Sequence, residues 1–139
     1  MRKNKKIWSA WSHKQANGLH SLQLMILERG IELLKVGGRI VYSTCSFNPI
    51  ENEAVVAEML NLAGESVRLV DVSAEMPELK RRCGLSNWSV RGRDEKTYAS
   101  FDDMPAEASE KIAKSMFPPA NAAGLHLERW YVGFKFESI

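Results

Sequence analysis

The sequence predicts an α/β protein built on a largely parallel sheet, of which two strands are evident. Helical and strand patterns alternate along residues 19–72, with glycines at the junctions. The 139 residues suit one domain, and 45% hydrophobic with 26% charged residues is the composition of a folded globular chain. No apolar run approaches the roughly 20 residues of a membrane helix, and no signal-peptide core follows the first residues. We therefore expect an intracellular protein, in the nucleus or cytoplasm, without a membrane partner.

The first predicted helix begins near Leu19 and is followed by a strand. Its expected core face has a spacing of three and four residues and consists of Leu24, Leu27, Ile31 and Leu34. Gly37-Gly38 is expected to supply the left-handed C-cap of this helix. Residues 39–44 are rich in β-branched and aromatic types, which predicts a buried strand.

A second helix is predicted to begin at Asn48-Pro49. Asn48 suits the N-cap, Pro49 the first helical position and Glu51 the reciprocal position of a capping box. The expected apolar side consists of Ala54, Val55, Met59 and Leu62. Gly64 marks the predicted end of the helix, and residues 67–72 alternate as a second strand.

The remaining sequence predicts less regular structure. Residues 73–124 contain several Met-Pro and Phe-Pro breaks and read as an irregular insertion or covering segment, with a short helix at residues 106–114. Residues 130–136 suit one last strand.

Basic residues are concentrated in two places, although the net charge is only +2. The first 14 residues contain no acid and combine two tryptophans, Trp8 and Trp11, with Arg2, Lys3, Lys5, Lys6 and Lys14. This mixture can bind phosphates and stack on bases. A second basic group spans residues 80–93, and solvated charged faces are an equally consistent interpretation of both. No metal site is expected, because neither cysteine has the spacing of a zinc ligand.

Cys45 is the leading candidate for chemistry. It lies where the first predicted strand runs into a loop, and ligands collect at the carboxyl ends of strands in open α/β sheets. The positive end of the helix that follows would favour a thiolate, but a small buried hydrophobe remains an alternative. Cys83 is interpreted as an incidental loop cysteine. His20 and His126 are expected to be structural, and Trp88 to pack in the core.

Residues 37–56 closely resemble a signature of the Nop/Sun RNA cytosine-5 methyltransferases. The match comprises Tyr-Ser-Thr-Cys-Ser at 42–46, the Asn-Pro step at 48–49 and Glu-Asn-Glu at 51–53. Further stretches agree with the branch that methylates transfer RNA: Arg2-Lys3-Asn4 with Trp8, Leu22-Gln23-Leu24, and Met116-Phe117-Pro118-Pro119 with residues 125–129.

The resemblance implies a fold and a mechanism. The fold would be the distal half of a Rossmann-like S-adenosylmethionine-dependent methyltransferase sheet, with an irregular C-terminal segment, so that residues 1–139 form a partial catalytic domain. The thiolate of Cys45 would attack carbon 6 of a cytosine in RNA, expected to be tRNA, and activate carbon 5 for methylation. Substrate contacts would come from Thr44, Ser46, Arg2, Lys3 and Asn4, although Thr44 and Ser46 are equally consistent with structural roles at a strand exit.

The chain also departs from the family pattern. It has nothing similar to the Asp-Xaa-Pro-Cys-Ser-Gly motif, which supplies a second cysteine and an aspartate, or to the Gly-rich turn and acidic strand end that hold the cofactor. The match also fails after Arg129. We therefore expect a piece of a longer enzyme that is inactive alone, with its cofactor held mainly by the absent half.

Half a sheet exposes an unpaired edge and an apolar face, so the chain should pair with itself or with the absent half. A non-catalytic RNA-binding or accessory module is the alternative function. A thiol-dependent hydrolase ranks last, because no histidine is placed to act as its base.

Overall fold

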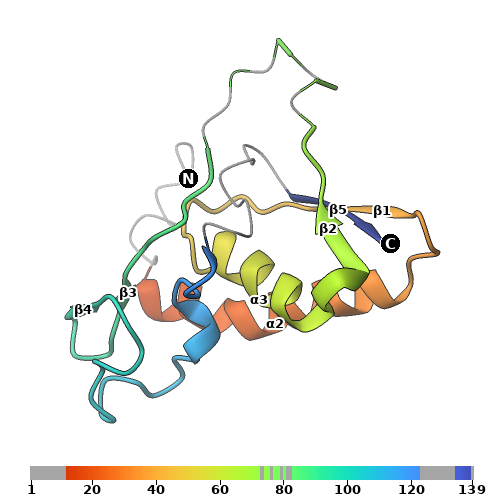
Figure 1. The fold of residues 1–139 in the computed structure, drawn as a ribbon. Coiled ribbons are helices and arrows are strands. Elements are labelled where there is room, and N and C mark those ends of the chain that lie inside the picture. Colours follow the sequence, from red (N-terminus) through yellow and green to blue (C-terminus); the bar gives the residue numbers. More distant parts are fainter. Residues whose placement is uncertain are drawn as a thin grey trace.

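The structure is a computed structural model that describes residues 12–72, 74–75, 77–78, 80, 83–122 and 134–138. Two α-helices and five strands lie within these residues (Figure 1). In chain order they are α2 (His13–Glu32), β1 (Arg39–Tyr42), α3 (Glu53–Ala63), β2 (Val67–Leu69), β3 (Val90–Arg91), β4 (Thr97–Tyr98) and β5 (Phe134–Ser138). Short 3₁₀ turns follow α3, as η1 (Gly64–Ser66), and precede the Phe-Pro-Pro stretch, as η2 (Lys114–Met116).

The main sheet has the strand order β1-β5-β2. β5 runs antiparallel to both neighbours, and Phe136 lies opposite Ile40 on one side and Leu69 on the other. β1 and β2 therefore run parallel to each other, as predicted, but with an antiparallel strand between them. The last predicted strand forms at 134–138; residues 130–133 lie outside the described residues.

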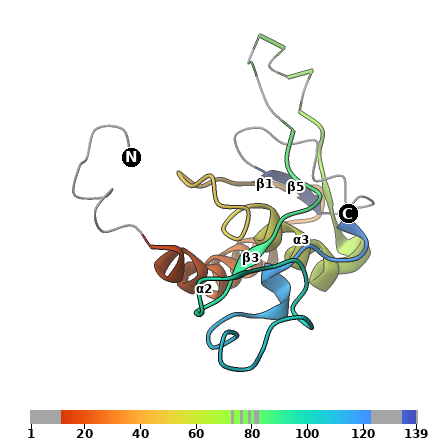
Figure 2. The same cartoon turned by 90° about the vertical axis from the view of Figure 1, so that its left-hand side faces the viewer.

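Helices α2 and α3 pack against each other on one side of this sheet (Figures 1 and 2). The core between these elements consists largely of α3 side chains: Ala54, Val55, Val56, Ala57, Met59 and Leu60 are all buried. Ile40 and Tyr42 of β1 pack against this core, whereas Val41 between them is 64% exposed. The expectation of a buried β1 is therefore wrong. Its side chains alternate between a packed face and a face that no described residue covers.

Helix α2 begins six residues earlier than predicted. Ser12 is its N-cap and accepts a hydrogen bond from the backbone N–H of Gln15. The predicted core face is confirmed for three of its four residues, because Leu27 is buried and Leu24 and Ile31 pack against the core. Leu34, the fourth, lies beyond the end of the helix. The C-cap is Leu33 rather than Gly37-Gly38. Gly37 instead has a φ of +73° in the turn that leads into β1, where a left-handed residue is required.

Helix α3 begins later than predicted, at Glu53, with Asn52 as its N-cap. Asn48 caps a preceding turn, in which its side-chain oxygen accepts from the backbone N–H of Ile50. Glu51 does not close a capping box; its carboxylate bonds to Ser46. Leu62 was expected on the apolar side but is exposed. Gly64 does end the helix, with a φ of +55°.

The described parts of residues 73–124 are mostly irregular, as predicted. They contain the small hairpin of β3 and β4, which pair antiparallel with Val90 opposite Tyr98. The short helix predicted at 106–114 does not form. Lys111 has a φ of +63°, which an α-helix cannot accommodate, so this stretch is a series of turns that ends in η2.

None of the described helices combines the length and apolar character needed to cross a lipid bilayer.

Candidate active site around Cys45

Cys45 is exposed on the loop that follows β1. Side chains alternate along this loop: those of Thr44 and Ser46 are half-buried, while Cys45 and Phe47 face outward. Phe47 is fully exposed, at 101%. The exposure of Cys45 is incompatible with the alternative of a small buried hydrophobe, and it leaves the thiol accessible to a substrate.

Asn52 fixes the loop from the start of α3. Its side-chain oxygen accepts a hydrogen bond from the Thr44 hydroxyl, with 2.6 Å between Oγ1 and Oδ1. Its amide nitrogen donates to the backbone carbonyls of Ser46 at 2.9 Å and of Asn48 at 3.1 Å. One side chain thus holds the residues on both sides of Cys45.

Glu51 provides a second tie. Its residue is only 7% exposed, and its carboxylate accepts a hydrogen bond from the Ser46 hydroxyl at 2.7 Å. The same hydroxyl accepts from the backbone N–H of Asn48 at 3.0 Å. Gln23 of α2 donates to the other carboxylate oxygen at 3.4 Å. This buried carboxylate therefore connects the loop to the neighbouring helix.

Tyr42, the last residue of β1, anchors the other end of the loop. Its hydroxyl donates to the backbone carbonyl of Glu51 at 2.6 Å. Burial, with a smaller contribution from the charge of Glu51, raises the pKa of Tyr42 well above its usual value. Tyr42 therefore stays a neutral donor. Its hydrogen bond to Glu51 joins the two ends of the loop formed by residues 43–50.

His20 of α2 supports the end of this loop at Ile50. It is 1% exposed, and its Nδ1 lies 2.8 Å from the backbone carbonyl of Ile50, while its Nε2 lies 2.9 Å from the hydroxyl of Ser115. Because a carbonyl can only accept, we assign the proton to Nδ1, so that Nε2 accepts from Ser115. The structural role predicted for His20 is confirmed; His126 lies outside the described residues.

This buried histidine should make stability depend on pH. Desolvation lowers the pKa of His20, outweighing the hydrogen bond to Ile50 and the charge of Glu58, which raise it. The unfolded chain therefore takes up this proton at a higher pH than the folded chain does. The free energy of unfolding should be constant above about pH 7 and fall as the pH drops through about 6.5, by at most about 1.4 kcal/mol per pH unit.

Urea denaturation between pH 5 and 8 measures this dependence. A His20→Gln variant should be less stable at pH 8 but should lose the fall between pH 6.5 and 5. An equally steep fall in the variant would assign the effect to other groups.

Three of the six predicted site residues, Cys45, Thr44 and Ser46, lie within the described part of the chain. Cys45 is exposed, and the hydroxyls of Thr44 and Ser46 bond to Asn52 and Glu51. The predicted substrate contacts Arg2, Lys3 and Asn4 lie outside the described residues. Sequence reasoning missed Asn52, although an amide residue immediately before a helical run is itself an N-cap indicator.

The other singled-out residues behave mostly as expected. Trp88 is 7% exposed and its indole N–H donates to the carbonyl of Met116 at 2.8 Å, so its packing role is confirmed. Cys83 is exposed. His13 lies 3.8 Å from the carboxylate of Glu95. The described residues contain no cluster of histidine, cysteine or acidic side chains able to hold a metal ion.

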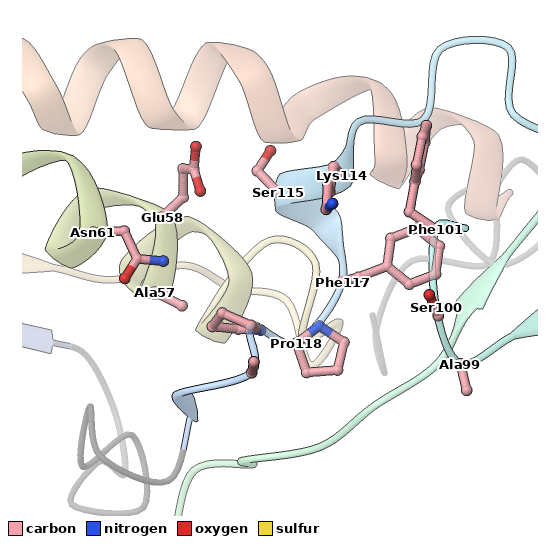
Figure 3. Close-up of a pocket in the computed structure, with 12 residues that line it drawn as sticks. Ala57, Glu58, Asn61, Ala99, Ser100, Phe101, Lys114, Ser115, Phe117 and Pro118 are labelled. Atoms are coloured by element: carbon pink, nitrogen blue, oxygen red, sulfur yellow. The ribbon is translucent and has the colours of Figure 1, made fainter. Parts of the chain in front are cut away.

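A cavity of about 420 Å³ lies away from Cys45, between α3, η2 and the segment after β4 (Figure 3). Glu58 and Asn61 of α3 face it on one side, and Phe101 and Phe117 form an edge-to-face pair on the other. Ser100, Lys114 and Ser115 are the other polar residues of its lining. The Phe-Pro-Pro stretch singled out in the sequence therefore lines this cavity.

The described residues do not fit an S-adenosylmethionine site. Such a site needs a Gly-rich turn that leads from a strand into a helix. In this chain Gly37-Gly38 precedes β1, and β1 is followed by the Cys45 loop with its hydrogen-bonded polar side chains. The described residues therefore cannot hold the cofactor by themselves.

Comparison with known proteins identifies the family. A family model described as 16S rRNA methyltransferase RsmB/F matches residues 1–101. The chain belongs to this family. The predicted relationship to the RNA cytosine-5 methyltransferases is confirmed by this match and by the tRNA-methylating relatives described next.

Individual relatives agree with this assignment. The chain is 48% identical to the multisite-specific tRNA:(cytosine-C(5))-methyltransferase of Schizosaccharomyces pombe, over 92% of this chain and 19% of that protein. It is 48% identical to the Saccharomyces cerevisiae enzyme of the same description, over 81% and 18% respectively. The tRNA (cytosine(34)-C(5))-methyltransferase of Drosophila melanogaster is 41% identical, over 85% and 16%. The chain thus spans less than one fifth of each of these relatives.

A solved structure supports the fold. The methyltransferase homolog protein from Pyrococcus horikoshii superposes with a TM-score of 0.52 over 93% of this chain and 34% of that chain, at 22% identity. The Rossmann-like methyltransferase fold predicted for this family is confirmed.

Proposed function

We propose that this chain is the nucleophile-bearing part of a longer RNA cytosine-5 methyltransferase that acts on tRNA. The observation that carries the proposal is the exposure of Cys45 on a loop whose flanking residues are fixed by Asn52 and Glu51. Relatives whose names specify tRNA cytosine methylation support tRNA as the substrate. Such an enzyme would work in the nucleus or cytoplasm, where tRNA is made and used.

In the proposed mechanism, Cys45 acts as a nucleophile on cytosine. Its thiolate sulfur forms a bond to carbon 6, and the electrons of the C5–C6 double bond move to carbon 5. Carbon 5 would then take a methyl group from a sulfonium donor, whose S–CH3 bond breaks to leave a neutral thioether. Transfer of the C5 proton to water or a base, with cleavage of the C6–S bond, would restore the double bond and free the thiolate. Covalent addition replaces one difficult step, attack by an unactivated carbon, with easier ones.

The loop supplies positioning. Because Thr44 and Ser46 bond to α3 and the turn before it, the backbone around Cys45 cannot shift without breaking several hydrogen bonds. Holding a reacting atom in place removes an entropic part of the barrier. We therefore assign Thr44 and Ser46 to positioning of the nucleophile. The hydroxyls of Thr44 and Ser46 already have hydrogen-bond partners. These two residues could therefore contact the cytosine base only through backbone groups, or after a hydroxyl has turned away from its present partner.

S-adenosylmethionine is proposed as the methyl donor of the longer protein. The family assignment supports its use, and the residues described here do not form its site. The chain alone should therefore add to cytosine without completing methylation.

Trapping with RNA that contains 5-fluorocytosine tests the function. Fluorine at carbon 5 cannot leave as the proton does, so a methylated adduct stays bound to the cysteine. We expect the longer protein to form an adduct that survives denaturation, and Cys45→Ala to form none, while Cys83→Ala, a change at the other exposed cysteine, forms it normally. An undiminished adduct from Cys45→Ala would refute the assignment.

We also propose that the isolated 139-residue chain associates with itself. Four large apolar side chains on α2 and one at its C-cap are exposed: Leu19, Leu22, Met25 and Ile26, and Leu33. This face lies opposite the core face of the helix, because Leu24, Leu27 and Ile31 are packed inward.

A further inference from the structure

A second cavity, of about 220 Å³, lies at the first turn of α2, where α2 meets β3 and the segment before η2. Its lining is rich in groups that bind anions: His13, Lys14, Arg91, Arg93 and Lys111. These residues come from three stretches of sequence that the fold brings together. The N-terminus of a 20-residue helix adds unpaired backbone N–H groups and the positive end of a dipole.

Cations exceed acids around this cavity. Lys14 and Arg91 both pair with Glu95, at 3.3 and 3.0 Å, and Arg93 pairs with Glu110. Lys111 forms no ion pair with any residue in the described part of the chain. Asp94 is a third acid here, because its carboxylate lies against Gly92 of the lining. Four permanent cations therefore face three carboxylates, which leaves one positive charge before His13 is counted.

Asn17 gives the cavity a second kind of binding group. It lines the cavity one turn into α2 and is only 5% exposed. Its amide nitrogen donates to the carbonyl of Arg91 at 3.4 Å, which fixes the orientation of the amide. Its oxygen has no hydrogen-bond partner among the described residues. A buried acceptor without a donor is destabilising, so this oxygen is suited to a ligand that donates a hydrogen bond.

We propose that this cavity binds the sugar-phosphate backbone of RNA, with the phosphate on the basic side chains and a ribose 2′-hydroxyl donating to Asn17. A phosphate carries acceptors only, so the cations and the helix N-terminus suit it, whereas the unpaired oxygen of Asn17 requires a donor. RNA carries both groups on every nucleotide, and DNA lacks the 2′-hydroxyl. This inference depends on the proposed function only in its choice of RNA as the ligand.

The site lies close to the Cys45 loop. One turn beyond Asn17, His20 contacts the carbonyl of Ile50, at the end of that loop. In both views the first turn of α2 and the loop after β1 lie on the same side of the molecule (Figures 1 and 2). A strand of RNA held at the cavity can therefore continue toward Cys45, and the cavity would bind nucleotides that flank the methylated cytosine.

Salt dependence of RNA binding tests the phosphate contact. Fluorescence anisotropy with a labelled tRNA anticodon-loop oligonucleotide, at several salt concentrations, gives the slope of log affinity against log salt. Lys111→Gln should weaken binding and reduce the magnitude of this slope by about 1, the value expected for one lost phosphate contact. Lys35→Gln is the matched control, because Lys35 is also exposed but follows the other end of α2, about 30 Å away. Equal slopes for the two variants would overturn the proposal.

A 2′-deoxy substitution series tests the role of Asn17. Replacing single riboses by deoxyriboses should weaken binding several-fold at one nucleotide of the oligonucleotide. In Asn17→Ala the same substitution should have no further effect, and circular dichroism checks that this variant is folded. If that variant does not fold, the deoxy series on the unmodified chain still decides: uniform binding across the series would remove the 2′-hydroxyl contact from the proposal.

These measurements are separate from adduct formation. A normal adduct at Cys45 with unchanged salt slopes refutes the backbone site alone. Changed slopes without any adduct at Cys45 refute the catalytic proposal alone.

Discussion

Replacing Asn52 by alanine is expected to slow adduct formation at Cys45 by about 10- to 100-fold. The change removes three hydrogen bonds, one to the Thr44 hydroxyl and two to the carbonyls of Ser46 and Asn48. A nucleophile displaced by about 1 Å can lose on the order of 100-fold in rate. The half-buried partners left unpaired should also lower the free energy of unfolding by about 2–4 kcal/mol.

The rate of adduct formation at saturating 5-fluorocytosine RNA separates positioning from binding. We expect the rate to fall while the RNA concentration for half-maximal rate changes little, because Asn52 bonds to the loop and not to RNA. Asn52→Asp keeps the acceptor for Thr44 but loses both donors, so its rate should be intermediate. Asn61→Ala is the matched control, since Asn61 is exposed further along α3. A destabilised Asn52→Ala variant with the original rate would show that the tie is only structural.

Ile26→Lys is expected to raise the self-dissociation constant of the 139-residue chain by at least about 100-fold. Ile26 is 62% exposed at the centre of the apolar face of α2, between Leu22 and Leu33. Burying such a side chain between two copies contributes about 1.5–3 kcal/mol per copy, and a buried lysine reverses that gain. In a two-fold pair each substitution counts twice.

Size-exclusion chromatography with light scattering over a concentration series measures this constant. The unmodified chain should exceed its monomer mass of 15.7 kDa, and Ile26→Lys should match it. Leu62→Lys is the control, because Leu62 is similarly exposed, at 58%, but lies on α3. A monomeric unmodified chain would contradict the prediction. Equal effects of the two substitutions would show that the interface does not lie on α2.

Local sequence patterns predicted the α2 core face, the start of β1 and the glycine that ends α3 because each depends on neighbouring residues. Helical spacing identified Leu24, Leu27 and Ile31, and these do pack inward. The start of α2 was missed because the apolar pattern begins late, although Ser12 and Gln15 have the spacing of a capping box. The pairing of β5 between β1 and β2 depends on contacts between residues far apart in the sequence. The local spacing of hydrophobic residues carries no information about such contacts.

The residues around Cys45 were predicted less completely than Cys45 itself. The family resemblance and the position after a strand both led to Cys45, which is exposed in the structure. Glu51 was interpreted as a capping residue because its spacing from Asn48 fits one. In the fold a turn separates the two, and a bond to the Ser46 hydroxyl replaces the cap. The cavity at α2 was not predictable, because it joins residues 13–17 with residues 91–93 and 110–112.

The position of β5 also sets an order of events during synthesis. β1 and β2 emerge from the ribosome well before their partner in the sheet, residues 134–138. Until these residues are released, both strands keep exposed edges, and the helix pair α2–α3 can form first because its contacts are nearer in sequence. A premature stop before Phe134 would therefore leave two unpaired strand edges open to aggregation, even though Cys45 and its loop are already complete.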